Sequence, residues 1–414
     1  MDKNTLNKLI NLPGYTVEEV LEFNDLEIHL LMRPLKNNIA ICSSCKKPHM
    51  AGFHSTVIVV AEDQSMCGRR VFLHIRKRKY RCPEDQKIHV EDTPWLKLFS
   101  RVTNRYASQI NRLTAITTNK EAGWYFGLDD EVVYRIDKRI LEEQAKEKLE
   151  PIPNGTHLSV DEVSYQKYHR YLTNVIDTDR RLVIWNAKGR KAEILNKYYK
   201  GIGEENCEKI ESVAMDGART FISSTKRYAV NALIVLDRFH LVQKLNQTVD
   251  NVRKIELKKA HANKNYDLAD LIGCKQRFIL LKKSSNLSEK QSEYLVKLCA
   301  INEPIYKAML LKDSFLQIYS MENNEEKIRQ YLDGWFDEAL NSGLESFVFL
   351  AYKLLSKICY ILNWFKQKIS SAISEGFNNK IKRLKRMAYG YKDIDYFRLK
   401  IHQHCGLLNP RIAT

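Results

Sequence analysis

The sequence predicts a mixed α/β protein with a core of alternating strands and helices. A small β-rich region and a three-helix unit precede this core, and a long helical stretch interrupts it. Three observations support the prediction. Apolar, strand-like runs recur between residues 157 and 240, each close to an acidic residue. A Cys-x-x-Cys pair stands near the amino terminus, and only helical patterns occur from residue 241 to about residue 370.

The bulk composition limits the class of protein. A chain of 414 residues is long enough for two to four domains, and 44% hydrophobic residues permit a sizeable core. The formal net charge of +17 favours polyanionic partners, nucleic acid before acidic membrane. We expect no membrane span and no secretion signal, because no apolar run is long enough. Nine cysteines, an odd number that is mostly scattered, are typical of a reducing cytosol, so we expect a cytoplasmic, nucleoid-associated protein.

The first candidate site lies in the amino-terminal region. Cys42 and Cys45 form a knuckle that can supply half of a tetrahedral zinc site. Cys82 and His89, with six residues between them, can supply the other half, and the strand-like runs between the halves favour a β-rich zinc ribbon. A redox role for the Cys-x-x-Cys pair is the alternative. The competing ligands are His49, His54 and Cys67.

A strongly basic strand follows the first half of this site. Residues 69–81 contain seven cations, and the apolar residues alternate with polar ones at first, so one face can be core while the other meets phosphate. The alternative is an edge strand that is merely protected by charge. The candidate DNA contacts here are Arg69, Arg70, Arg76, Lys77, Arg78 and Lys79.

Residues 98–150 predict three helices. The second helix runs from Asn119 to Phe126 and ends at Gly127, and Asp129 can cap the third. A helix, a glycine turn and a helix are the outline of a helix-turn-helix, although three-helix units also occur without DNA. On the third helix, Arg135 and Arg139 are the candidate DNA contacts.

The core begins after the helix-breaking stretch 151–155. Three strands, the runs 158–162, 171–177 and 181–187, are expected to form an antiparallel meander. Strands then alternate with helices up to residue 240, which is the order of an RNase H-like fold. The apolar strands carry Asp161, Asp216 and Asp237 at or near their carboxyl ends. Aspartate is common at strand ends, but three in a basic protein indicate a metal site.

The chain between residues 241 and 370 is expected to be a long helical insertion, and a helix carrying Glu375 follows it. Phe377, Ile381 and Leu384 form one apolar stripe on that helix. Glu375 shares another face with Asn378 or Asn379 and with a lysine, a combination that suits both a metal and a phosphate backbone, although an ordinary surface helix gives the same pattern. The basic candidates on this helix are Lys382, Arg383, Lys385 and Arg386.

These residues resemble the ISL3-type insertion-sequence transposases over essentially the whole chain. The segment SEGFNNKIKRLKRMAYGY is the most specific part of the resemblance, followed by DRFH and by LSVDEVSYQKYHRY at residues 158–171. The resemblance implies an RNase H-like core in which Asp161, Asp216 and Glu375 hold the catalytic metal. It also implies supporting roles for Asp237 and His240. Members commonly have a second cysteine soon after the one that corresponds to Cys82; none follows here, so His89 is expected to substitute.

The resemblance and the chemistry of the residues predict the cofactors and partners. Two Mg²⁺ (or Mn²⁺) ions held by carboxylates can activate water and then a 3′-hydroxyl, so no covalent enzyme intermediate is needed. We expect a structural zinc, DNA partners in the form of terminal inverted repeats and target DNA, no membrane, and a homodimer or higher oligomer on DNA. The expected domains are 1–97 (zinc ribbon), 98–150 (helix-turn-helix), 151–240 and 371–414 (core) and 241–370 (insertion).

Two other classes of protein compete with a transposase. A DNA-binding regulator would keep the zinc ribbon and the helix-turn-helix but would carry a dead core, which the intact acids argue against. A structure-specific nuclease on the same fold would share the acids but would not need two DNA-reading modules. Metal-dependent strand joining separates the three classes, because the regulator performs neither step and the nuclease cuts without joining.

Overall fold

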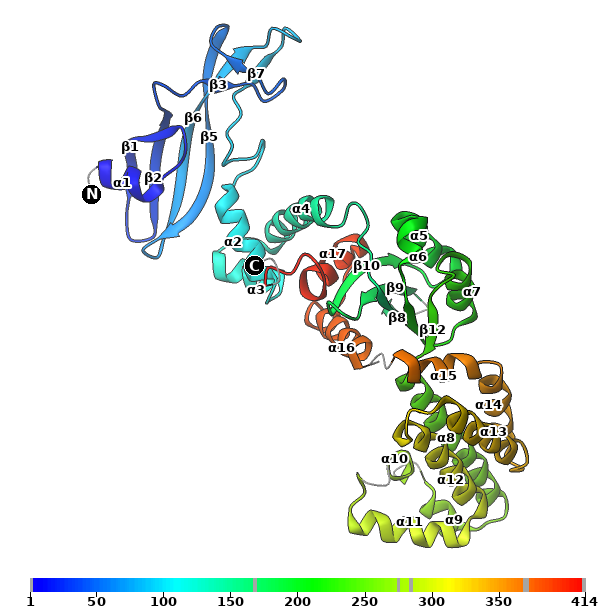
Figure 1. Ribbon diagram of the computed structural model, residues 1–414. Coiled ribbons are helices and arrows are strands. Elements are labelled where there is room, and N and C mark those ends of the chain that lie inside the picture. The colour runs from blue at the N-terminus through cyan, green and yellow to red at the C-terminus, as the bar shows by residue number, and fades with distance from the viewer. Residues whose placement is uncertain (1–2, 167–169, 274–275, 283–285, 368–371, 412–414) are drawn as a thin grey trace. The chain divides into compact units, whose positions relative to one another are not determined.

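The computed structural model describes residues 3–166, 170–273, 276–282, 286–367 and 372–411 (Figure 1). The chain divides into two compact units, Met1–Lys146 with Asn409–Thr414, and Glu147–Leu408. This division lies close to the boundary expected at residues 150–151. The finer domain limits remain predictions. The end of the insertion near residue 370 and part of the 158–171 motif lie outside the described residues.

The first unit is built on a twisted mixed sheet, with both antiparallel and parallel strand pairs. This sheet is larger than the small zinc ribbon expected. Its strands run in the order β1-β2-β6-β5, and β7 pairs with β6. Helix α1 (Lys3–Ile10) supplies apolar side chains to the same core. The strands are β1 (Tyr15–Phe23), β2 (Glu27–Pro34), β5 (Phe53–Met66), β6 (Arg69–Arg81) and β7 (Ile88–Val90).

The long hairpin of β5 and β6 dominates this sheet. Cys67 and Gly68, at its tip, have φ angles of 49° and 79°, as a two-residue hairpin turn with two positive φ values requires. Val71, Leu73 and Ile75 are fully buried, whereas the residues between them are half-buried. The predicted alternation of β6 is therefore confirmed.

Three helices follow the sheet, α2 (Asn104–Thr114), α3 (Asn119–Phe126) and α4 (Asp130–Lys148). Thr118 and Glu121 cap α3 reciprocally, and Gly127 ends it in the left-handed region, as predicted. Buried Asp137 of α4 accepts hydrogen bonds from Asn111 and Thr114 of α2, which fixes the two helices together.

The second unit contains a five-stranded mixed sheet in the order β10-β9-β8-β11-β12. The first three strands form the predicted antiparallel meander, and β11 and β12 lie parallel to β8. The strands are β8 (His157–Gln166), β9 (Arg170–Asp177), β10 (Leu182–Lys188), β11 (Ser212–Met215) and β12 (Leu233–Leu236). The intervening helices are α5 (Ala192–Ile202), α6 (Glu204–Glu208) and α7 (Arg219–Tyr228).

The position of Asp161 differs from the expectation. Asp216 and Asp237 immediately follow β11 and β12, but Asp161 lies in the middle of β8. The reason is that β8 pairs with β11 only as far as Val160, whereas its pairing with β9 continues to Gln166. Asp161 is therefore level with the carboxyl end of β11, although its own strand continues.

Helices cover both faces of this sheet (Figure 1). Leu158 and Val160 pack with α5 and α7 on one face. Val163 and Tyr165 pack on the other face, in one core with α16 (Ala372–Met387) and α17 (Ile394–Cys405). That second core includes the predicted apolar stripe of α16, which is confirmed: Phe377, Ile381 and Leu384.

The insertion between β12 and α16 is helical throughout its described part and has a large core of its own. Its helices are α8 (Arg238–Ala262), α9 (Tyr266–Leu271), α10 (Arg277–Leu281), α11 (Glu289–Ile301), α12 (Glu303–Gln317), the short helix η3 (Ile318–Ser320), α13 (Glu325–Leu340), α14 (Glu345–Leu355) and α15 (Ile358–Gln367).

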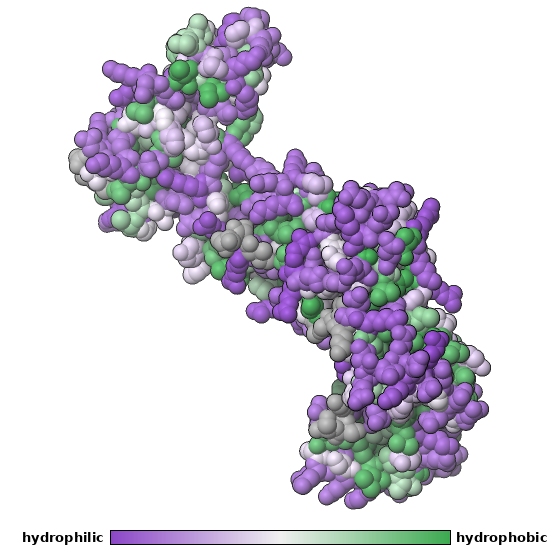
Figure 2. Space-filling model, viewed as in Figure 1, coloured by the Kyte–Doolittle hydropathy of each residue, from purple (hydrophilic) through white to green (hydrophobic). Residues whose placement is uncertain are grey.

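The insertion is attached to the sheet through α15 and the start of α8. Asn363 donates a hydrogen bond to the backbone oxygen of Ile234 in β12 at 2.9 Å. The guanidinium of Arg238 stacks over the rings of Tyr319 and Trp364, so it is used in attaching the insertion. Hydrophilic residues cover much of the visible surface of the second unit, with hydrophobic residues exposed between them (Figure 2).

Gly123→Ala should destabilise the three-helix unit. A Cβ atom at Gly123 would lie 2.6 Å from the backbone oxygen of Leu128, so the turn after α3 would have to move. Gly334→Ala in α13 is the matched control, because nothing lies within 4 Å of its Cβ position, and it should stabilise by up to about 1 kcal/mol. Thermal unfolding of the full chain measures both changes. Equal effects of the two substitutions would contradict the close approach.

Candidate functional site

A cluster of metal ligands lies beside the main sheet of the first unit. Cys42, Cys45, His49 and Cys82 place one ligand atom each within 4.8 Å of all the others, and no other such group of three or more occurs in the described part of the chain. Three of the four residues are buried. Burial alone would raise the pKa of the Cys42 thiol, but the backbone groups of Cys45 and Ser44 lower it, which favours the thiolate that zinc binds. Three sulfurs and one imidazole form a typical structural zinc set.

The fourth member of the cluster is His49, not the expected His89. The short strands β3 (Ala40–Ile41) and β4 (Pro48–His49) form a hairpin that brings the Nε2 of His49 to 3.4 Å from the Sγ of Cys45. The Nε2 of His89, on β7, lies 2.6 Å from the Oδ2 of Asp85 instead. The spacing Cys-x₃-His from Cys45 to His49 was the signal in the sequence, and pairing the cysteines with the later His89 overlooked this local hairpin.

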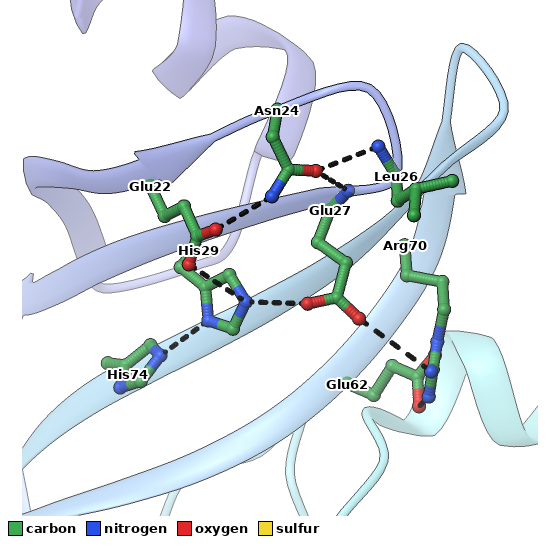
Figure 3. A network of polar contacts seen from close by, with 8 residues as sticks. All are labelled: Glu22, Asn24, Leu26, Glu27, His29, Glu62, Arg70 and His74. Atoms are coloured by element: carbon green, nitrogen blue, oxygen red, sulfur yellow. Dashed lines mark hydrogen bonds and ion pairs between the residues drawn. The ribbon is translucent and has the colours of Figure 1, made fainter.

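The predicted basic strand β6 uses most of its cations within the protein. Arg70 donates two hydrogen bonds to Glu62, at 2.9 and 3.0 Å, and lies 3.8 Å from Glu27. Figure 3 shows this pair at the end of a polar network in which the ring of His29 lies between Glu27 and His74. Arginine residues held in this way are less available to phosphate than the sequence suggests.

The remaining cations of β6 differ in their partners. Arg76 binds Glu18 at 2.7 Å, and Arg78 binds buried Glu91 at 2.7 Å. Lys77 is buried, which lowers the pKa of its ammonium group. Lys79 has no carboxylate partner within 4 Å among the described residues. Arg69 donates a hydrogen bond to the backbone oxygen of Asn24 at 2.7 Å and lies 3.3 Å from exposed Asp25.

The acidic site of the second unit is centred on Asp161. The side-chain amide of Asn378 donates to the Oδ2 of Asp161 at 2.5 Å, which resolves the choice between Asn378 and Asn379. The Nε2 of His240 lies 3.6 Å from the same oxygen and 3.9 Å from the Oδ2 of Asp237. Three elements therefore meet at one carboxylate oxygen: β8, α16 and the start of α8.

The pKa of His240 reflects the combined charge of the site. Burial lowers its pKa, but the contact with Asp161 and the negative charges of Asp161, Asp237 and Asp216 more than offset this effect, so the pKa of His240 is raised. All three aspartates expected at the site are thus close enough to act on one imidazole. Asp237 also caps α8, because its Oδ1 accepts a hydrogen bond from the backbone N–H of Phe239 at 2.7 Å.

Asp216 lies in the turn that leaves β11. Its Oδ1 accepts a hydrogen bond from the backbone N–H of Ala218 at 2.8 Å. Gly217 has a φ of 82°, and a Cβ there would lie 2.5 Å from Leu236, so only glycine fits this turn. Gly217 therefore allows the chain to turn sharply and leaves the carboxylate of Asp216 at the carboxyl end of β11.

Two contacts fix the position of Glu375 on α16. The hydroxyls of Ser374 and Ser159 lie 2.6 Å apart in a buried contact, and Asn378 binds Asp161. Glu375 is one residue beyond the first contact and three residues before the second. Because positions i and i+3 lie on the same side of a helix, Glu375 and Asn378 share the face that meets β8.

Sequence reasoning assigned no role to several residues near these acids. Burial, followed by the charge of Asp216, raises the pKa of Glu162 to about 7. Glu162 adjoins Asp161 in the sequence, so its acidity was visible but its burial was not. Lys244 and Lys357 donate to the backbone oxygens of Asp216 and Gly217, at 3.0 and 2.6 Å. Nothing in the local sequence links either lysine to the strand end.

Most of the candidate DNA-contacting cations on helices α4 and α16 are more exposed than the cations of strand β6. Arg135 of α4 is exposed and lies 3.8 Å from Glu131, whereas Arg139 is half-buried. On α16, Lys382, Arg383 and Arg386 are exposed, and Lys385 donates to the backbone oxygen of Ser164 at 3.2 Å. Their role in DNA binding remains a prediction.

The structure places a cysteine–histidine cluster in one unit and a mixed sheet with converging aspartates in the other. Comparison with known families identifies the class of protein. A family of transposases of the ISL3 type matches residues 158–401, and a zinc-finger family of the transposases of IS204, IS1001, IS1096 and IS1165 matches residues 40–85. The first match spans more than half of the chain, which therefore belongs to the ISL3 transposase family.

Individual relatives cover the chain more fully. The transposase of insertion sequence element IS1001 from Bordetella parapertussis is 27% identical over 97% of this chain and 98% of its own length. The transposase of IS1557 from Mycobacterium tuberculosis is 25% identical over 78% of this chain and 76% of its own length. Within the described residues, no helix is long and apolar enough to cross a membrane.

Zinc content should separate His49 from His89. Purified His49→Ala and Cys82→Ser variants should lose most of the bound zinc, whereas His89→Ala should retain about one ion per chain, because His89 lies outside the cluster. Metal analysis by mass spectrometry measures the content. Zinc retained by His49→Ala and lost from His89→Ala would reverse this assignment.

The substitutions Arg78→Ala and Lys79→Ala should distinguish a cation of β6 that stabilises the fold from one that contacts DNA. Arg78→Ala leaves the charge of buried Glu91 without its main partner and should destabilise the protein by about 3 kcal/mol. Lys79→Ala should change stability by less than about 0.5 kcal/mol. If Lys79→Ala removes a phosphate contact, this substitution should also reduce the slope of log K for DNA binding against log salt by about 0.9. Urea unfolding and DNA binding at several salt concentrations measure both effects, and an unchanged stability in Arg78→Ala would contradict the structural role.

Proposed function

We propose that this transposase is a metal-dependent DDE enzyme that cleaves the ends of an insertion sequence and joins them to target DNA. The single observation that best supports the proposal is the convergence on Asp161 of Asn378 from α16 and His240 from α8. It brings together the strand and the helix that carry two of the proposed acids. The family membership supports the same reaction class in general terms.

We further propose that the core is RNase H-like. The sheet order, in which a three-stranded antiparallel meander is followed by two parallel strands, supports this assignment. So do the helices on both faces of the sheet and the acid that follows the first parallel strand. The long insertion between β12 and α16 is compatible with the fold, because it leaves α16 against β8.

The proposed metal ligands are Asp161, Asp216 and Glu375, with Asp237 and His240 in supporting roles. Carboxylate oxygens are the donors that Mg²⁺ and Mn²⁺ prefer, and Mg²⁺ keeps several waters, so an open set of acids is adequate. The donor chemistry therefore fits the metal. Asp237 caps α8 with one oxygen and faces His240 with the other, and we propose that it supports the site by orienting these groups.

The bound metal would supply charge stabilisation for the attacking and leaving oxygens of the phosphodiester. The residues of this chain perform the remaining work. Asn378 and His240 orient the carboxylate of Asp161 from two sides. The Ser159–Ser374 contact holds the first turn of α16 against the strand, which positions Glu375. The raised pKa of His240 favours its charged form, and this form balances the negative charge of the acids.

DNA recognition is proposed for elements in both units. In the first unit, exposed Arg135 and the zinc ribbon are candidates for binding the terminal inverted repeats. In the second unit, the exposed cations of α16 are candidates for contacting the DNA backbone near the acids. We also propose a homodimer or higher oligomer on DNA, because joining two element ends requires two active sites, and cytoplasmic action at the nucleoid.

The two competing classes are less well supported. A regulator with a dead core gives no reason for His240 and Asn378 to orient Asp161. A structure-specific nuclease would share the acidic site, but it would have no need of the preceding zinc-ribbon module that the family match identifies. A joining assay distinguishes both from a transposase.

Alanine substitutions in the acidic site test the proposal. With Mg²⁺ and a duplex made from the DNA that flanks the coding sequence, the parent protein should give nicked and joined products. Asp216→Ala should abolish both products and keep DNA affinity within a few-fold, because a metal ligand is lost and the fold is not. Asp237→Ala should retain some Mn²⁺-dependent cleavage. If Asp216→Ala still cuts while a folded Asp237→Ala is inactive, the two roles must be exchanged.

A further inference from the structure

Four cations from three elements gather around the strand end that carries Asp216. Lys244 comes from α8, Lys353 and Lys357 come from α14 and the turn after it, and Arg219 begins α7. Lys244 and Lys357 are half-buried and are fixed by the backbone oxygens of Asp216 and Gly217. Most of this cluster belongs to the insertion, so the insertion carries positive charge to the acidic site.

The four cations are placed together by the fold and are not matched by ion pairs. Lys244 and Lys357 donate to the adjacent backbone oxygens of Asp216 and Gly217, at 3.0 and 2.6 Å. Lys353 lies in the last turn of α14, four residues before Lys357, and Arg219 follows Asp216 by three residues. Within the described part of the chain none of the four has a carboxylate within 4 Å, whereas buried Asp250 of the same insertion contacts both Arg253 and Lys254. Cations gathered in this way attract an anion.

The geometry of the ammonium groups leaves capacity for such an anion. A lysine ammonium has three N–H donors, and the backbone contacts of Lys244 and Lys357 each use one. Lys353 and Arg219 are exposed and can reach a ligand directly. A metal ion held by Asp216 would offset the negative charge of that carboxylate and would leave the cluster more attractive to an anion.

The aromatic residues beside the cluster favour a nucleic acid over a small anion. The ammonium of Lys353 lies 3.9 Å from the ring centroid of Phe349, and Phe349 and Tyr352 are each 62% exposed. Exposed aromatic rings interleaved with cations are typical of surfaces that bind a DNA strand through its phosphates and bases. A solvated lysine face has no need of large apolar rings.

We propose that Arg219 and Lys353, supported by Lys244 and Lys357, bind the DNA backbone phosphates next to the scissile bond. The insertion thereby acts as a positioning element for the substrate strand in addition to covering the edge of the sheet. This inference rests on the proposed function, because it takes the acids near Asp216 to be the cleavage site.

The test uses the full chain and the flanking-DNA duplex, in Ca²⁺ to suppress cleavage. The double variant Arg219→Gln/Lys353→Gln should reduce the slope of log K against log salt by about 1.8, since each lost phosphate contact contributes about 0.9. Lys297→Gln on α11, an exposed lysine of the same insertion, is the matched control and should leave the slope unchanged. Within the part of the chain that the structure describes, neither substituted side chain of the double variant donates a hydrogen bond to the acidic site, so folding should be kept, which circular dichroism verifies.

Neutral methylphosphonate linkages then locate the contact. Replacing the phosphates beside the cleavage position should weaken binding by the parent protein and by Lys297→Gln, but should weaken binding by the double variant little further. The inference would be overturned by an unchanged salt slope in the double variant. It would also be overturned if the neutral linkages reduced the DNA affinity of the parent protein and of the double variant equally. Cleavage of the same duplex by the parent in Mg²⁺ keeps the two proposals apart: failure to cut counts against the proposed function alone, whereas normal cutting with an unchanged slope in the double variant counts against the phosphate contact alone.

Discussion

The docking of α16 against β8 is the constraint on which the acidic site depends. The Ser159–Ser374 contact joins residues that are 215 positions apart in the chain, and one turn further along the helix Asn378 binds Asp161. Both contacts are polar and lie beside the apolar packing of Phe377 on the sheet. The apolar stripe holds the helix to the sheet, and the hydrogen bonds select its register, since a shift of one residue would separate both pairs. The insertion can therefore be long without disturbing the acids.

The distribution of charge differs between the two units. In the first unit, the arginines of β6 are matched by carboxylates of neighbouring strands, as in the pairs of Arg70 with Glu62 and of Arg78 with Glu91. Such pairs stabilise a sheet that would otherwise repel itself, but they reduce the charge that is left for DNA. Around Asp216, by contrast, the cations of the described residues form no ion pairs with carboxylates, and Lys244 and Lys357 contact only backbone oxygens. A basic run in a sequence is thus a weaker indicator of a nucleic-acid surface than cations that the fold leaves without partners.

Much of the fold could be predicted because it is encoded by local patterns. The strand alternation in β6, the glycine that ends α3 and the apolar stripe of α16 each depend on residues a few positions apart. Strand β1 is not among the predicted strands, and register shifts after Val17 and Val20 interrupt its pairing with β2. The candidate site was harder to predict from the sequence. Spacing predicts the three cysteines of the metal cluster and offers both His49 and His89, but the choice of His49 depends on the β3–β4 hairpin. The half-buried carboxyl of Glu162 and the lysines fixed at the end of β11 depend on tertiary contacts that no local pattern encodes, and the ligand roles of the acids remain predictions.

The central claim is that the register of α16 on β8 builds a metal site from Asp161, Asp216 and Glu375. Crystals of the protein soaked in Mn²⁺, with data collected at the manganese absorption edge, test it most directly. The account predicts an anomalous peak within ligand distance, about 2.2 Å, of carboxylate oxygens of Asp161 and Asp216, with Glu375 facing the same ion or a second one. A peak held by Asp237 and His240, with the Asn378–Asp161 hydrogen bond intact and no metal at Asp216, would contradict it.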